Sequence, residues 1–167
     1  IGSATAGNLL VATFVTSTTP GTITGFSGWT LVTSATSSSA TTYMYYKVAS
    51  GGETALTIST VNTINLYLSL VEIAGFTTTP SLNVSSSNTA ANGSSSVSTT
   101  SSTGPTNTVT PAFAIVGIGH NGANDPSSWT DSYVEDITAI TSNALHIAAK
   151  PLTASAANST TFTWTTT

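Results

Sequence analysis

Two apolar segments, roughly a hundred residues apart, constrain the fold of this chain more than any other feature. They are NLLVATFV at 8–15 and AFAIVGIG at 112–119. Each is a nearly continuous apolar run bounded by turn residues, which is typical of a buried strand. The segments that follow also correspond in order: GWT at 28–30 to SWT at 128–130, YMYYKVA at 43–49 to ALHIAAK at 144–150, and LTIST at 56–60 to FTWTT at 162–166. We expect two similar sets of strands, neither able to bury its apolar face alone.

The rest of the chain indicates strands and not helices, because β-branched residues, aromatic residues and turn clusters recur at short spacing. The expected strands are 8–16, 29–37, 41–49, 55–61, 65–76 with Leu66, Leu68 and Leu70 inward, 111–119, 129–137, 144–149 and 161–164. Ser50 to Glu53 supplies the turn residues of a hairpin loop. The sequence therefore predicts an all-β, two-sheet antiparallel β-sandwich, jelly-roll-like, with two pseudo-repeated halves. An immunoglobulin-type strand order would show the same alternation.

We expect one domain over residues 1–167. Half one covers about 7–76 and half two about 111–167, with a Ser- and Thr-rich loop region at about 77–110. That region is expected to hold long loops and one or two edge strands. It is not a domain boundary, because neither half has a complete sheet.

Charge is scarce, at 5% of residues, with two lysines, no arginine and a net charge of -4. Nucleic-acid binding needs several cations to displace counterions from phosphates, so we expect no nucleic-acid partner. A polybasic membrane contact is excluded likewise, and the longest apolar runs are too short for membrane insertion. The absence of cysteine removes disulfides, thiolate metal sites and thiol nucleophiles.

Several of these motifs occur together in known modules: GNLLVA, a Pro/Gly loop, Gly-Trp-Thr, an aromatic strand ending in Val-Ala before a Gly-Glu turn, and VEIAGF. In this order they resemble the jelly-roll-like β-sandwich domains of bacteriophage virion proteins, of decoration or fibre type, and of large secreted bacterial proteins. Those modules usually open with Gly-Asp-Leu-Leu-Val-Ala, and Asn8 replaces the Asp here. The resemblance implies a non-enzymatic structural or recognition module displayed on a surface.

The residues predict no enzyme and no cofactor. Glycoside hydrolysis needs two carboxylates facing each other across a cleft, and the six carboxylates show no such pairing. Glu72 lies between apolar neighbours, but it is better interpreted as a strand-edge carboxylate that reaches solvent or pairs with Lys47 or Lys150. No Gly-x-Ser-x-Gly turn and no phosphate loop occurs. His146 is expected in the core or at a strand edge.

Metal and ligand sites have few candidates. Zinc would need more ligands than His120 offers, so no metal is expected; a calcium held by Asn121 and Asp125 is the weaker alternative. For a glycan, stacking on Tyr46 or Trp164 is the candidate, because alternation places Tyr46 on the face opposite Tyr43 and Tyr45. Trp29 and Trp129 hold equivalent positions in the two halves, which favours a role in the core or at a corner.

The expected function is a non-enzymatic structural protein of a virion surface, a capsid decoration subunit or a head- or tail-fibre module, acting as an oligomer. Its partners would be copies of itself and other virion or surface proteins. One alternative is a carbohydrate-binding or adhesin module of a secreted bacterial protein, which would bind glycans. Another is a self-polymerising extracellular fibre subunit whose arm at 1–6 adds to a neighbour's sheet. All of these imply an extracellular or virion-surface location.

Overall fold

The computed structural model describes residues 2–17, 20–37, 40–83, 85–89, 96–98, 112–121, 126–139, 143–152 and 160–164. These residues contain twelve strands: β1 Leu9–Thr16, β2 Ile23–Thr24, β3 Thr30–Thr36, β4 Thr41–Val48, β5 Ser59–Thr60, β6 Leu66–Ile73, β7 Ser96–Ser98, β8 Ala112–Asn121, β9 Pro126–Trp129, β10 Val134–Ala139, β11 Asn143–Leu152 and β12 Thr161–Trp164. The described part of the chain is all-β, as predicted. Within it, no helix has the length and apolar character needed to cross a membrane.

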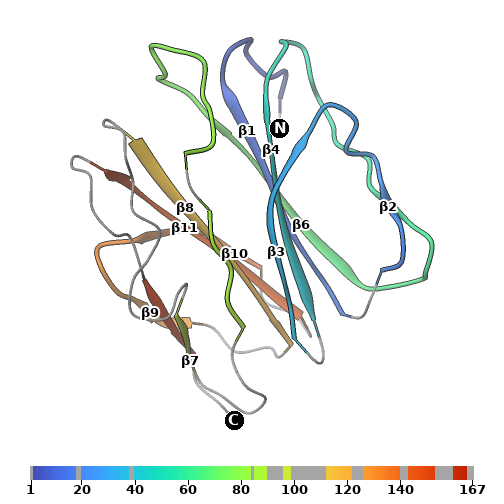
Figure 1. Ribbon diagram of the computed structural model, residues 1–167, viewed down its shortest axis with the longest axis vertical. Coiled ribbons are helices and arrows are strands. Elements are labelled where there is room, and N and C mark those ends of the chain that lie inside the picture. Colours follow the sequence, from blue (N-terminus) through green and yellow to red (C-terminus); the bar gives the residue numbers. More distant parts are fainter. Residues whose placement is uncertain are drawn as a thin grey trace.

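Two larger antiparallel sheets form the sandwich (Figure 1). One has the order β3-β4-β1-β6 and the other the order β10-β11-β8. They face each other, because β1 contacts both β8 and β11, β4 contacts β8, and β6 contacts β11. Two small sheets, β2-β5 and β7-β12-β9, complete the described strands. The prediction of a two-sheet antiparallel sandwich is confirmed, while its jelly-roll character stays a prediction.

The two halves of the sequence are equivalent in sheet order, which confirms the predicted pseudo-repeat. β3, β4 and β1 lie side by side in the first sheet, and β10, β11 and β8 hold the same order in the second. The strands of the small sheets correspond in the same way, since β2 pairs with β5 and β9 pairs with β12. The recurrence of apolar segments along the chain therefore reflects a recurrence of strand pairing.

Strand β1 is the centre of the core, and seven of its eight residues are buried. Its two faces differ, because successive side chains in a strand point to opposite sides. On one face the Phe14 ring stacks on Tyr43 of β4 at 4.9 Å and on Phe26 at 5.5 Å between centroids. On the other face Thr13 and Val15 lie against β8. Both faces of the strand must therefore be apolar, which explains its continuous run.

Aromatic clusters cover the outer faces of both sheets in the same way. On the first sheet, Tyr45 of β4 stacks on Phe26 at 3.9 Å, and Phe26 meets Trp29 edge-on at 6.0 Å. On the second, His146 of β11 lies 4.9 Å from Phe162, whose ring is 4.7 Å from Trp129. The predicted core or corner role of Trp29 and Trp129 and the core placement of His146 are thus confirmed.

The sheets converge at one end and diverge at the other, as β1 and β8 show in Figure 1. The close end depends on two glycines of β8. A Cβ atom on Gly117 would lie 2.5 Å from Cγ2 of Thr13, and one on Gly119 would lie 2.4 Å from Cγ2 of Val15. At the open end the inward positions of β8 carry Phe113 and Ile115 instead. The inward face of β8 thus changes from large residues at one end to glycines at the other, and this change sets the angle between the sheets.

Some local predictions were wrong. The turn after β4 exists, but it does not close a hairpin, because β5 is only two residues long and pairs with β2. The expected strand 129–137 is two strands, separated by Asp131 and Ser132 with φ of 59° and 62°. Leu66, Leu68 and Leu70 do not face the second sheet. They share the face of Phe14, because Leu68 pairs with Phe14 in the register of β1 and β6.

Candidate functional site

The diverging end of the sandwich holds an apolar groove of about 410 Å³ between the two sheets. Both sheets line it, through Val11 of β1, Val71 and Ile73 of β6, Phe113 and Ile115 of β8, and Ile147 of β11. Two of its residues remain well exposed: Phe113 at 42% and Val134 at 71%. The groove exists because the sheets separate where β8 carries large inward side chains.

The chemistry of this groove is restricted to apolar contact. Among its described lining residues the only ionisable group is Glu72. The Glu72 carboxylate is already engaged, since its Oε1 accepts hydrogen bonds from the Thr5 backbone N–H at 2.8 Å and from the Asn8 side-chain amide at 2.7 Å. The groove can therefore enclose aliphatic or aromatic groups, whereas its walls place no acid–base pair together.

Glu72 has a structural role in holding the N-terminal arm. The backbone bond from Thr5 and then the bond from Asn8 lower the pKa of Glu72 below its usual value. Neither lysine is its bonding partner, so that part of the prediction was wrong. Asn8 fits this arrangement because its side-chain amide donates a hydrogen bond to the Glu72 carboxylate, whereas a carboxylate at this position would repel it.

Glu53 closes the neighbouring turn. Its carboxylate pairs with Lys47 Nζ at 2.9 Å and accepts backbone N–H bonds from Ser50 at 2.8 Å and Gly51 at 2.9 Å. The backbone of Ala4 is bonded to this turn in both directions, donating to Glu53 O and accepting from Gly52 N, each at 2.8 Å. The described part of the N-terminal arm is thus docked on its own domain. A fibre built by donating residues 1–6 would first have to break these contacts.

Stability should decrease at acidic pH through Glu53. The Lys47 side chain, followed by the backbone N–H of Ser50, lowers the pKa of Glu53 from 4.5 to about 2. A folded-state pKa below the unfolded value stabilises the fold fully above about pH 4.5, and this contribution disappears as the pH falls towards about 2. We expect Glu53→Gln to reduce the loss of unfolding free energy between these two pH values.

Urea unfolding of both proteins at a series of pH values between these limits measures this effect. Glu72→Gln is the matched variant, and it should remove a separate share of the pH dependence. If Glu53→Gln follows the same pH profile as the parent, the turn contributes nothing through Glu53 ionisation.

Lys150 also interacts with residues of its own domain. Its Nζ donates to the backbone oxygen of Asp131 at 3.1 Å and lies 4.7 Å above the centre of the Tyr133 ring. Tyr133 is buried, and this burial, with a smaller effect of Asp131, raises the pKa of its hydroxyl. Lys47 pairs with Glu53, so both lysines of the chain have intramolecular partners.

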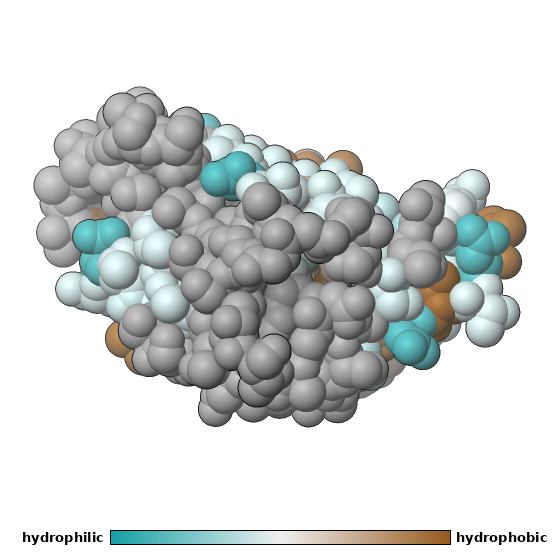
Figure 2. Space-filling view, turned by 90° about the horizontal axis from the view of Figure 1, so that it is seen from below, coloured by the Kyte–Doolittle hydropathy of each residue, from teal (hydrophilic) through white to brown (hydrophobic). Residues whose placement is uncertain are grey.

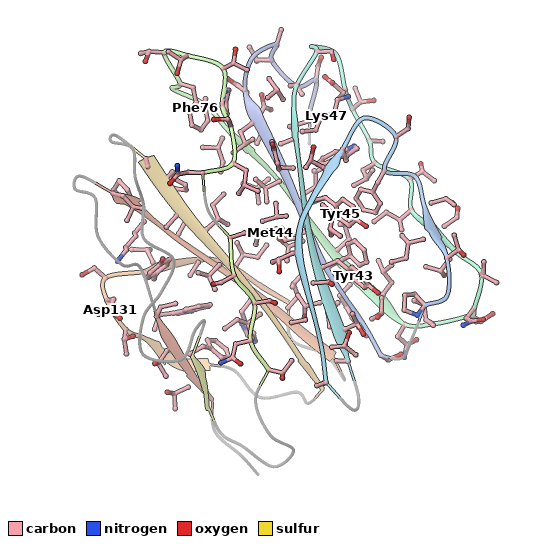
Figure 3. All side chains as sticks on the ribbon, in the orientation of Figure 1. Tyr43, Met44, Tyr45, Lys47, Phe76 and Asp131 are labelled. Carbon is pink, nitrogen blue, oxygen red and sulfur yellow. The ribbon has the colours of Figure 1, made fainter. Side chains whose placement is uncertain are left out.

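The structure places the two proposed glycan-stacking residues on different sheets. Tyr46 is half-buried on β4 opposite Val11, so it lies on the face directed at the second sheet. Figure 3 shows its neighbours Tyr43 and Tyr45 on the side of β4 towards β2, with Met44 on the opposite side. The alternation predicted for these tyrosines is confirmed. Trp164 pairs through its backbone with Pro126 of β9, and its side chain lies outside the described residues.

The weak metal candidate is not tested by the described residues. Asn121 ends β8, where it pairs with Asn143 through the backbone, and its side chain lies outside the described part, as does that of His120. Asp125 lies wholly outside it. Within the described residues, no group of three His, Cys, Asp or Glu side chains could hold a metal ion.

Sequence reasoning missed the groove as a feature. Its signal was present in AFAIVGIG, where Phe113 and Ile115 are followed at the same spacing by Gly117 and Gly119. Read by alternation, this pattern puts large residues at one end of a face and none at the other. No known protein family, curated protein or solved structure matches the chain.

Proposed function

We propose that this domain is a non-enzymatic structural protein of a virion surface, either a capsid decoration subunit or a head- or tail-fibre module, that acts as an oligomer. The observation that carries the proposal is the engagement of both lysines, Lys47 with Glu53 and Lys150 with Asp131 and Tyr133. The chain has no arginine. Only 5% of the residues are charged, so the surface can pack against further copies with few charged groups to desolvate.

The surface composition supports the same proposal. Figure 2 views the molecule from below relative to Figure 1. The described residues on this face are mostly near neutral in hydropathy, with small separate hydrophilic and hydrophobic areas. Exposed positions of β3 carry hydroxyls at Thr30, Ser34 and Thr36. Hydroxyl groups keep such a surface hydrated without charge. The resemblance of GNLLVA and VEIAGF to virion sandwich modules gives this neutral surface its proposed location.

The native mass of the purified chain tests the proposal. Light scattering behind a sizing column should give a discrete closed oligomer such as a trimer. Because few exposed charges take part, the association constant should change by no more than about twofold between about 50 and about 500 mM sodium chloride. A monomer at every concentration would contradict oligomerisation, and the glycan-binding alternative would then be tested with a glycan screen. An open-ended series of large species would favour the fibre subunit.

A further inference from the structure

The N-terminal arm lies over Leu10 of β1, on the face of the first sheet that points away from the second sheet. Ala4 of the arm is 3% exposed and packs in one cluster with Leu10 and Ala49. Leu10 pairs in register with Lys47 of β4 on one side and with Glu72 of β6 on the other. Residues paired in this way direct their side chains to the same face of a sheet. The arm therefore covers Leu10 between a lysine and a carboxylate.

Two carboxylates hold the two sides of the arm. On the β6 side, Glu72 Oε1 accepts hydrogen bonds from the Thr5 backbone N–H at 2.8 Å and from the Asn8 side-chain amide at 2.7 Å. On the β4 side, Glu53 orders the turn whose backbone exchanges two hydrogen bonds with Ala4. Hydrogen bonds to an ionised acceptor are stronger than those between neutral groups. Docking of the arm therefore depends on the ionisation of Glu72.

Among the described residues, Glu53 is the charged group of the turn that acts on Glu72. Lys47, two strands away on β4, is paired with Glu53 at 2.9 Å. The backbone bond from Thr5 and then the bond from Asn8 lower the pKa of Glu72, partial burial and Glu53 oppose them, and the amino group of the first residue adds a smaller decrease. A carboxylate whose pKa is lowered by docking favours the docked state fully above its undocked pKa, and this preference disappears as the pH falls through the docked value. Acid therefore weakens docking.

We propose that protonation of Glu72 at acidic pH releases the N-terminal arm from the sheet while the two-sheet sandwich stays folded. The arm is suited to local release, because within residues 2–6 only Ala4 is buried. β1 keeps its pairing with β4 and β6 over eight residues on both sides, and this pairing does not involve the arm. Release uncovers Leu10. The inference concerns a movement within one chain, so it goes beyond the proposed function and holds whatever the oligomeric state is.

Hydrogen exchange of single amides, measured by NMR on the full chain, tests this inference. The reporters are the amides of Ala4 and Gly52, whose bonds join the arm to the turn without using a carboxylate. The range from about pH 6 to about pH 3 leaves Glu53 ionised, because its pKa is about 2. Over this range the protection of both reporters, relative to an unstructured peptide at the same pH, should fall by about fivefold or more. The amides of β1 that bond to β4 should keep their protection.

Two outcomes of this measurement would overturn the inference. If the reporters stay as protected at about pH 3 as at about pH 6, the arm is not released by acid. If β1 loses protection together with the reporters, acid unfolds the whole domain and the arm is not a separate element.

Glu72→Gln tests the assignment to Glu72, because the amide keeps a carbonyl acceptor and removes the charge. Its reporters should be less protected than those of the parent at about pH 6, and their protection should change by less than about twofold down to about pH 3. Asp131→Asn is the matched control, since its carboxylate accepts from the neighbouring Thr130 hydroxyl. This control should follow the parent. A parental pH profile in Glu72→Gln would overturn the inference.

Asn8→Asp should reverse the sign of the pH dependence. At about pH 7 the two ionised carboxylates at positions 8 and 72 repel each other, so the reporters should be poorly protected. Mild acid places a proton between the two carboxylates, and protection should then rise before it falls. Protection that only decreases with acid, as in the parent, would show that the Asn8 side chain does not face Glu72 in the docked arm.

Discussion

Replacing Phe14 by alanine is expected to lower the free energy of unfolding by about 3–5 kcal/mol, the usual range for a fully buried phenylalanine. The Phe14 side chain is 0% exposed and stacks on Phe26, Tyr43 and Tyr45. Phe14 lies in β1, which is paired with a strand on each side. The neighbouring backbone is therefore held in place and cannot move in to fill the cavity that the substitution leaves. A loss of this size is a large part of the total stability of a domain, which is typically about 5–15 kcal/mol.

Equilibrium unfolding in urea measures this loss, and Phe76→Ala is the control with the same change in side chain. Phe76 is 39% exposed and follows the end of β6. Its replacement should cost about 1 kcal/mol or less, because much of its surface is already in water. Equal losses for the two variants would mean that Phe14 does not occupy the core position described above.

Replacing Gly119 by alanine is expected to lower the free energy of unfolding by about 3 kcal/mol, at the upper end of the usual cost of overpacking a core. The new Cβ atom would lie 2.4 Å from Oγ1 of Thr42, 2.4 Å from Cγ2 of Val15 and 2.6 Å from Cβ of Val15. The Cβ atom of Val15 cannot move without its backbone. The sheets would have to separate at the end where they converge.

Two further variants make this result specific. Gly2→Ala is the control, because a Cβ atom there would meet nothing within 4 Å, and it should leave stability unchanged. Val15→Ala should rescue part of the loss in the double variant, since it removes the methyl groups that meet the new Cβ. Additive losses for Val15→Ala and Gly119→Ala would show that the two residues do not touch.

Much of the fold could be predicted because its signals are local. The apolar run at 8–15 and the segment 161–164 gave strands close to their observed bounds, β1 and β12. The order of Trp29 and Trp129 within their halves identified the pseudo-repeat. Each of these inferences uses only alternation, turn residues and order along the chain. In the low-complexity region, the described strand β7 lies at the edge of its small sheet.

The candidate site was less accessible to prediction, because its contacts join residues that are far apart in the sequence. Glu72 bonds with Thr5 and Asn8, about 65 residues away. Alternation alone could not say that Lys47 would pair with Glu53 and not with Glu72. The groove depends on β6, β8 and β11 lying around the end of the sandwich where the two sheets separate. No local pattern gives the distance between two sheets.

The sequence by itself determined that this protein is an all-β sandwich of two similar halves, because strand propensity and burial are expressed in alternation along the chain. Only the tertiary structure decided which face of each strand meets the other sheet. Leu68 shows the difference, since its strand was predicted correctly and its face was not. A shift of one residue in pairing exchanges the two faces of a strand, and that pairing is set by residues distant in the chain.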